Sequence, residues 1–162
     1  MCAGKILFAQ KSNVCYLKLI GELRYNLSQG FDSIVKQELK NDKTNTFIID
    51  LSETEYLDST NLGIIGMVAA GLKNKSDQKP RLNAPNKDIQ TILNSMSFNT
   101  LFEITNKPLV EDLHFKDTSQ LGTNLRDSKD LVLESHKTLS EMSSYNKEKF
   151  IPVIDAILKK KK

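Results

Sequence analysis

Hydrophobic residues in the first part of the chain follow two spacings, one typical of strands and one typical of helices. Apolar runs at 5–10 and 14–20 lie on either side of a short polar stretch, which predicts a β-hairpin. We expect the exit from this hairpin to be a loop at 21–23. Apolar residues at 31, 34, 35 and 39 have the spacing of one helix face, and we expect Ser28 to cap that helix.

The next two segments resemble a buried strand followed by a tightly packed helix. Residues 47–51 (FIIDL) are almost all apolar, and helical patterns on both sides favour an interior parallel strand. Apolar residues then recur with helical spacing over 62–72, interrupted by Gly63 and Gly66. Glycine in a helix interior costs about 0.5–1 kcal/mol relative to alanine. We therefore expect these glycines to let a neighbouring backbone approach closely.

A weak strand at 81–85, a helix capped by Asn86 and a short strand at 101–104 complete the pattern. The resulting order is β-β-α-β-α-β-α-β. Strands that alternate with helices predict an α/β domain, with a mixed four- to five-stranded β-sheet covered by α-helices. We expect this domain to occupy residues 3–115.

The chain changes character after Pro108. Residues 116–130 are polar and predict a linker, whereas residues 131–160 predict a C-terminal helical extension of two helices, with Pro152 inside the second. An amphipathic face normally needs burial. We therefore expect the extension to pack on the domain itself; a dimer contact or a partner-docking helix pair are the alternatives.

The composition limits the class of protein. The chain has 162 residues, of which 39% are hydrophobic and 27% charged, as in a soluble cytoplasmic protein. No apolar run approaches the roughly 20 residues of a membrane-spanning helix, and the first residues make a poor signal peptide. The net charge of +3 comes largely from the lysines at 159–162, without interleaved aromatic residues. We therefore expect binding to neither nucleic acid nor membrane.

Side chains that commonly carry catalysis are sparse. Cys2 and Cys15 have no metal-like spacing, and Cys15 lies in a strand-like run, which favours a small core residue. His114 and His136 belong to no metal or nucleophile pattern, so we interpret each as a surface or helix-packing imidazole. We predict that the protein is not an enzyme and uses no metal or cofactor.

One polar cluster stands where the predicted strand gives way to the glycine-containing helix: Asp58, Ser59, Thr60 and Asn61. These are the residue types that cap helices, so one of them is expected to accept hydrogen bonds from the free backbone N–H groups. The alternative is that Ser59 accepts a phosphate. A phosphoserine carries about −1.5 to −2 charges and would meet the positive end of the helix dipole.

The segment IIDLSETEYLDSTNLGIIGM resembles the signature of the STAS domain, as found in bacterial anti-anti-sigma factors. The matching positions are Asp50-Leu51, Leu57-Asp58-Ser59 and Leu62-Gly63, and the stretch Gly21-Glu22-Leu23 is also similar. The resemblance implies a STAS fold, and the predicted order of elements agrees with it.

The resemblance also implies a mechanism of partner switching, with Ser59 as the phosphorylation site. The unphosphorylated protein would bind an anti-sigma factor, often itself a serine kinase, and so free the sigma factor. Phosphorylation would abolish binding, and a PP2C-type phosphatase would restore it. The expected partner-binding residues are Arg24, Asp58, Ser59, Thr60, Asn61 and Gly63. Two of these depart from the family: Asn61 replaces a common glycine, and Arg24 replaces a frequent acidic residue.

A second interpretation keeps the fold but not the phosphorylation. The stretch SHKTLSEMSSYNKEKF resembles tails on proteobacterial anti-anti-sigma proteins of biofilm and motility control. On this interpretation the protein is a STAS-type scaffold that binds a diguanylate cyclase or a small ligand without modification of Ser59.

Overall fold

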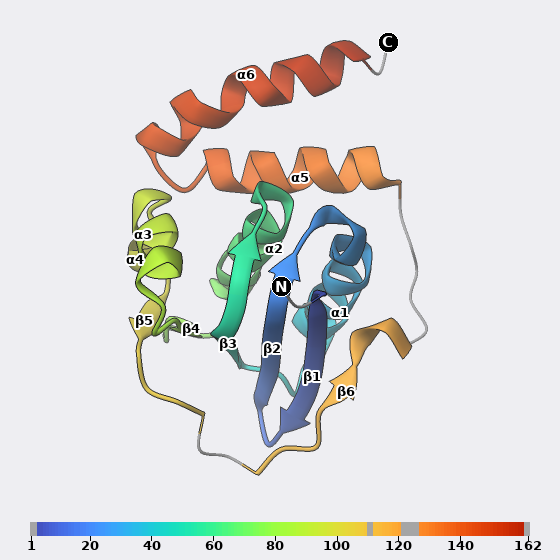
Figure 1. The fold of residues 1–162 in the computed structure, drawn as a ribbon, viewed down its shortest axis with the longest axis vertical. Helices are drawn as coiled ribbons and strands as arrows, with labels where there is room; N and C mark the ends of the chain where they lie inside the picture. The colour runs from blue at the N-terminus through green and yellow to red at the C-terminus, as the bar shows by residue number, and fades with distance from the viewer. Residues whose placement is uncertain (1–2, 110–111, 121–126, 161–162) are drawn as a thin grey trace.

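The computed structural model describes residues 3–109, 112–120 and 127–160. The chain forms a six-stranded mixed sheet in the order β5-β4-β3-β2-β1-β6, with helices around it (Figure 1). Its strands are β1 Lys5–Lys11, β2 Val14–Leu23, β3 Thr46–Leu57, β4 Arg81–Asn83, β5 Glu103–Thr105 and β6 Lys116–Asp117. Its helices are α1 Ser28–Lys40, α2 Ser59–Leu72, α3 Lys87–Ser95, α4 Phe98–Leu101, α5 Ser128–Ser140 and α6 Ser144–Lys160, with short 3-10 helices η1 Tyr25–Leu27 and η2 Thr118–Gln120. The predicted α/β class is confirmed.

The predicted hairpin is confirmed, with β1 and β2 antiparallel. The predicted exit loop is wrong, because β2 continues through Leu23 and pairs there with Leu57 of β3. The continuation passes an irregularity in the pairing next to Gly21, whose φ of 76° is open to glycine and strained for other residues. The extended strand brings the end of β2 beside the end of β3.

The buried strand is also confirmed and is longer than predicted. β3 pairs in parallel with β2 on one side and with β4 on the other, so it lies inside the sheet. Phe47, Ile49 and Leu51 are fully buried in the core. Cys15 is buried there as well, as expected. Burial raises the pKa of its thiol far above the usual range, which leaves it protonated and unreactive.

Three local expectations need correction. Ser28 does not cap α1: Leu27 holds the cap position, and the Ser28 hydroxyl donates to the Tyr25 carbonyl at 2.6 Å. The last predicted strand begins later, at Glu103, because the residues before it form the short helix α4. The sixth strand, β6, lies in the stretch expected to be polar linker, where two residues are too few to show a periodicity.

The C-terminal extension packs on the domain itself, which confirms that expectation. α1 and α2 lie together on one face of the sheet, and α5 crosses the end of the molecule toward which β2 and β3 point (Figure 1). α5 contacts α2, and α6 packs on α5 from outside. Pro152 is accommodated within α6. Among the described helices, none is both long enough and apolar enough to cross a membrane.

Candidate functional site

The polar cluster predicted from the sequence lies at the junction of β3 and α2, and Asp58 is its cap. The backbone of Asp58 is extended, and its carboxylate accepts a hydrogen bond from the Asn61 backbone N–H at 2.9 Å. The Asp58 backbone N–H donates to the Leu23 carbonyl at 3.1 Å, which joins this junction to the end of β2. Because Asp58 supplies the cap, the Ser59 hydroxyl is left for another interaction.

The buried side chain of Asn61 holds the Asp58 carboxylate in its capping position. Asn61 is fully buried, and its amide donates to the Asp58 carboxylate at 2.9 Å and to the Leu23 carbonyl at 3.2 Å. Its backbone is helical, so the asparagine needs no unusual angle where the family commonly has glycine. Partner contact by Thr60 and Asn61 stays a prediction; both are buried, so Asn61 acts here by holding Asp58.

Ser59 is the first residue of α2, and its hydroxyl pairs with a residue 77 positions further along the chain. The Ser59 Oγ lies 2.9 Å from Nε2 of His136, on α5. The His136 ring is only 6% exposed and stacks on Phe150 of α6, with ring centroids 5.5 Å apart. Burial lowers the pKa of His136, and the nearby Asp58 charge opposes this shift in part. The imidazole is therefore neutral at pH 7.

The expectation for His136 was incomplete. The side chain does pack between helices, as expected, but it also contacts the serine at the centre of the predicted site. No local pattern signals this contact, because it exists only once α5 has docked on α2. Histidine and serine at a separation of 77 residues carry no motif that could have been found in the sequence.

The glycines of α2 form the seat on which α5 rests. A Cβ atom added to Gly63 would lie 2.5 Å from both the Cβ and the carbonyl oxygen of Ser135. One added to Gly66 would lie 3.2 Å from a methyl carbon of Thr138 and 3.3 Å from the Met142 sulfur. The expected close approach of a neighbouring backbone is confirmed at Gly63, whereas the neighbours of Gly66 are side chains. In both cases the neighbour is the C-terminal extension. We call the surface formed by Ser59, Gly63 and Gly66 the Ser59 face.

Arg24 lies beside this junction and remains exposed. Its guanidinium stands 4.6 Å from the centre of the Tyr56 ring and 3.3 Å from the Glu22 carboxylate. Tyr25 and Tyr56 are 54% and 41% exposed. Large aromatic side chains and arginine are enriched at protein interfaces. The ends of β2 and β3 therefore present an exposed rim, Arg24, Tyr25 and Tyr56, next to the covered Ser59 face.

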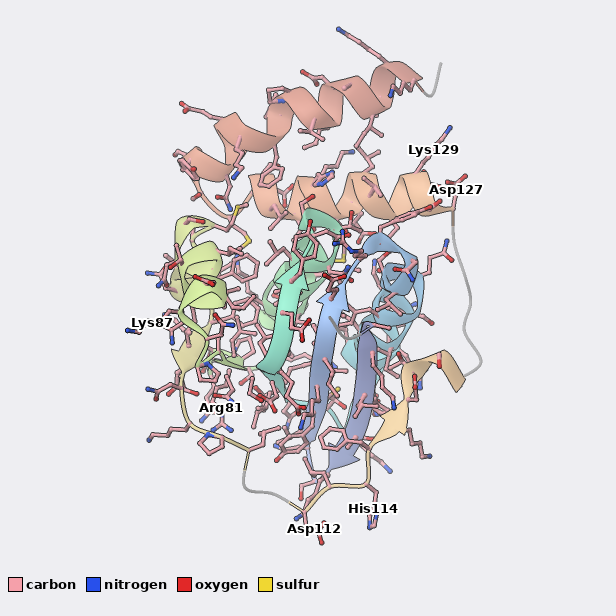
Figure 2. The ribbon with its side chains drawn as sticks, in the orientation of Figure 1. Arg81, Lys87, Asp112, His114, Asp127 and Lys129 are labelled. Atoms are coloured by element: carbon pink, nitrogen blue, oxygen red, sulfur yellow. The ribbon has the colours of Figure 1, made fainter. Side chains whose placement is uncertain are left out.

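Other candidate chemistry lies elsewhere or is absent from the described residues. His114 is exposed and lies at the end of the molecule opposite α5, where Figure 2 shows it near Asp112. The start of α5, marked in Figure 2 by Asp127 and Lys129, lies at the other end. Within residues 3–109, 112–120 and 127–160, no cluster of histidine, cysteine or carboxylate side chains could hold a metal ion.

Acidification is expected to weaken the docking of α5 through His136. Its pKa in the docked state lies below that of a solvated imidazole, about 6.5. Stability from the docked neutral ring is therefore fully present above about pH 6.5 and falls with pH below it, because the undocked state binds the proton more readily. The Asp58 carboxylate lies near the ring, and the Lys149 ammonium lies 6.0 Å from the centre of the Phe150 ring on which the imidazole stacks.

Thermal unfolding between pH 8 and pH 5.5 measures this effect. The melting temperature of the wild-type chain should fall more steeply with pH than that of His136→Gln, which stays neutral throughout. His114→Gln is the matched control, because it removes an exposed histidine and should keep the wild-type slope. Equal slopes for His136→Gln and wild type would contradict the effect.

Comparisons with known proteins agree with this architecture. The STAS domain family model matches residues 5–115. A solved structure of the anti-sigma factor antagonist SpoIIAA in its unphosphorylated form superposes with a TM-score of 0.54 at 13% identity, over 65% of this chain and 90% of that one. The phosphorylated form of the Bacillus cell fate determinant SpoIIAA gives 0.50 at 12% identity, over 65% and 93%. No curated protein matches the sequence significantly.

Proposed function

We propose that this chain, which belongs to the STAS domain family, is an anti-sigma factor antagonist that switches partners through phosphorylation of Ser59. The observation that carries the proposal is that Asp58 and Ser59 have different roles at the start of α2. Asp58 caps the helix, so Ser59 stands at the first position with a hydroxyl that the helix itself does not need. A modification there leaves the cap in place.

The local electrostatics favour a phosphate at this position. The start of a helix carries the equivalent of roughly half a positive charge, which stabilises a bound anion by about 0.3–1 kcal/mol at exposed sites. A phosphoserine adds about −1.5 to −2 charges at pH 7. The domain can therefore carry the phosphate, while the new charge changes what binds next to it.

The proposed partners are an anti-sigma factor with serine kinase activity and a phosphatase. The unphosphorylated protein binds an anti-sigma factor, which is itself a serine kinase or associates with one, and so frees the sigma factor. Phosphorylation of Ser59 ends that binding, and a PP2C-type phosphatase restores it. Asp58 and the exposed rim of Arg24, Tyr25 and Tyr56 supply the surface around Ser59 that these partners contact. The cycle takes place in the bacterial cytoplasm and regulates transcription; the protein itself performs no catalysis.

Variants of Ser59 test this function. Ser59→Ala should bind the anti-sigma factor constitutively, and Ser59→Asp should bind it at least about tenfold more weakly, a difference of roughly 1.4 kcal/mol. The measurement is titration by calorimetry, after the factor has been captured from source cells with Ser59→Ala as bait and purified. Mass spectrometry of the protein from the same cells should find phosphate on Ser59.

Ser52→Asp is the matched control, because it places the same charge at an exposed position of β3. It should bind as the wild-type chain does. Equal affinity of Ser59→Ala and Ser59→Asp for the anti-sigma factor would reject the switch.

A STAS-type scaffold that works without phosphorylation is the second candidate. One observation favours it: the Ser59 hydroxyl is paired with His136 of α5 and its side chain is half-buried, which restricts the approach of a kinase. Such a scaffold would bind a diguanylate cyclase or a small ligand in biofilm or motility signalling. Absence of phosphoserine from protein isolated from its cells, with equal partner binding by both Ser59 variants, would support this candidate over the first.

A further inference from the structure

The Ser59 face is a helix-docking surface, and α5 occupies it. We infer that the α5–α6 pair is a displaceable intramolecular cover of this face, and that a kinase or binding partner gains access to Ser59 only when α5 leaves. The inference rests on the proposed function in so far as Ser59 is the modified residue. The cover itself can be tested without that assumption.

The first argument is the shape of the surface. Gly63 lets the backbone of a crossing helix come into contact with α2, because any Cβ at this position would meet the Ser135 backbone. Gly66 makes room for the side chains of Thr138 and Met142. A surface of this shape accepts a helix with a small residue at the crossing point, as α5 does with Ser135. The partner that competes with α5 is therefore expected to present an α-helix with a small residue at the same place.

The second argument is the position of Ser59 itself. Phosphoryl transfer forms a bond between Oγ and the γ-phosphorus of ATP, breaks the bond to the bridging oxygen, and releases ADP and the hydroxyl proton. The γ-phosphate must approach Oγ in line with the bond that breaks. In the closed chain the Ser59 Oγ lies 2.9 Å from His136, and the side chain is half-buried next to α5. The space that the phosphate needs is held by the imidazole.

The third argument is that the contact between α5 and the domain contains features that weaken it. The Ser135 Oγ and the His136 Nδ1 are both buried in the contact without a hydrogen-bond partner among the described residues. Burial of a polar atom without a partner weakens an interface. α5 is also tied to α1 by an ion pair between Lys36 and Glu134, at 2.6 Å, whose side chains are more than one-third exposed. Exposed ion pairs contribute little to stability.

The attachment is nevertheless specific. The buried Asn146 amide of α6 donates to the Met96 carbonyl at the end of α3, at 2.7 Å. Leu131 and Leu139 of α5 are fully buried in the same core as α2. The cover therefore has a defined closed position rather than a range of loose ones.

Thiol labelling measures the cover directly. The Ser59→Cys variant is made in a Cys2→Ser background and treated with N-ethylmaleimide; Cys15 is buried, with a raised thiol pKa, and stays unlabelled. Addition of Leu139→Asp, which places a charge at a fully buried position of α5, should speed labelling at least about tenfold. Leu158→Asp makes the same substitution at a position of α6 that is 41% exposed, and should leave the rate unchanged.

Equal labelling rates in all three chains would overturn the cover. Hydrogen exchange in β2 and β3 serves as the folding control, because protection there shows that Leu139→Asp has opened α5 without unfolding the domain. If Leu139→Asp loses that protection, the cover is tested instead with a variant in which α5 is held closed by a disulfide.

The locked variant is Gly66→Cys with Thr138→Cys, positions at which a Cβ on α2 lies 3.2 Å from the Thr138 methyl carbon. A disulfide between them should hold α5 on α2, and a reducing agent should release it. The probe is the anti-sigma factor captured with Ser59→Ala. Because Gly66 belongs to the Ser59 face, the single variant Gly66→Cys is the reference for binding. Binding should be lost, at least about tenfold, in the oxidised double variant and should return on reduction to the level of Gly66→Cys alone.

Failure of the proposed cover and failure of the proposed function give different results. Equal binding by oxidised and reduced chains would overturn the cover and leave the proposed function standing. Failure of Ser59→Ala to capture an anti-sigma factor, together with the expected labelling rates, would reject the proposed function and keep the cover.

Discussion

Gly63→Leu is expected to detach α5 and α6 from the domain while the sheet and α2 stay folded. The new side chain would enter space held by the Ser135 backbone, 2.5 Å from where its Cβ must stand. Overpacking of this kind costs about 1–3 kcal/mol or more, whereas the change within α2 itself gains about 1 kcal/mol in helix propensity. Amide protection of residues 128–160 in hydrogen exchange should fall about a hundredfold, which corresponds to roughly 2.7 kcal/mol.

Gly30→Leu is the matched control. A Cβ atom at Gly30 in α1 would meet nothing within 4 Å, so the same substitution should leave α5 protected and the chain equally or more stable. Retained protection of residues 128–160 in Gly63→Leu would contradict the seat described for α5.

Asp58→Ala is expected to lower the free energy of unfolding by about 2.5–4 kcal/mol. The substitution removes the cap of α2, worth about 1 kcal/mol. It also removes the bond between the carboxylate and the buried amide of Asn61, and hydrogen bonds to charged groups are worth roughly 1.5–3 kcal/mol. Urea unfolding followed by circular dichroism measures the difference.

Asn86→Ala separates the two contributions. Asn86 caps α3 through its side-chain oxygen, which accepts from the backbone N–H groups of Asp88 and Ile89, and it braces no buried amide there. Its loss should cost only about 1 kcal/mol. Equal destabilisation by Asp58→Ala and Asn86→Ala would mean that Asn61 contributes nothing beyond the cap.

Local patterns predicted most of the STAS domain because each rests on a short-range cause. The hairpin, the parallel β3 and the cap at Asn86 follow from residues that are neighbours in sequence. The errors arose where tertiary contacts override local chemistry. β2 continues through Gly21 because β3 offers it a partner, and β6 exists because β1 has a free edge.

The candidate site was predictable in part for the same reason. The helix cap at Asp58 could be predicted because capping residues precede an apolar helix in the sequence. Gly63 and Gly66 likewise predicted that another segment packs closely on α2. The identity of that neighbour was not visible. It depends on a helix that begins 65 positions after Gly63 at Ser128, and no spacing rule connects His136 with Ser59.

The docking of α5 on its own chain sets a concentration threshold for any protein that uses the Ser59 face. A tethered segment competes at an effective concentration that reaches the millimolar range for short flexible connections. A partner binds only to the fraction of chains whose cover is open. Its apparent dissociation constant equals the intrinsic dissociation constant divided by that fraction. If one chain in a hundred is open, an intrinsic nanomolar partner behaves as one of roughly a hundred nanomolar. In the proposed cover, the strength of the contact between Gly63 and Ser135 would therefore set the partner level at which the protein responds, without any change in the surface that the partner recognises.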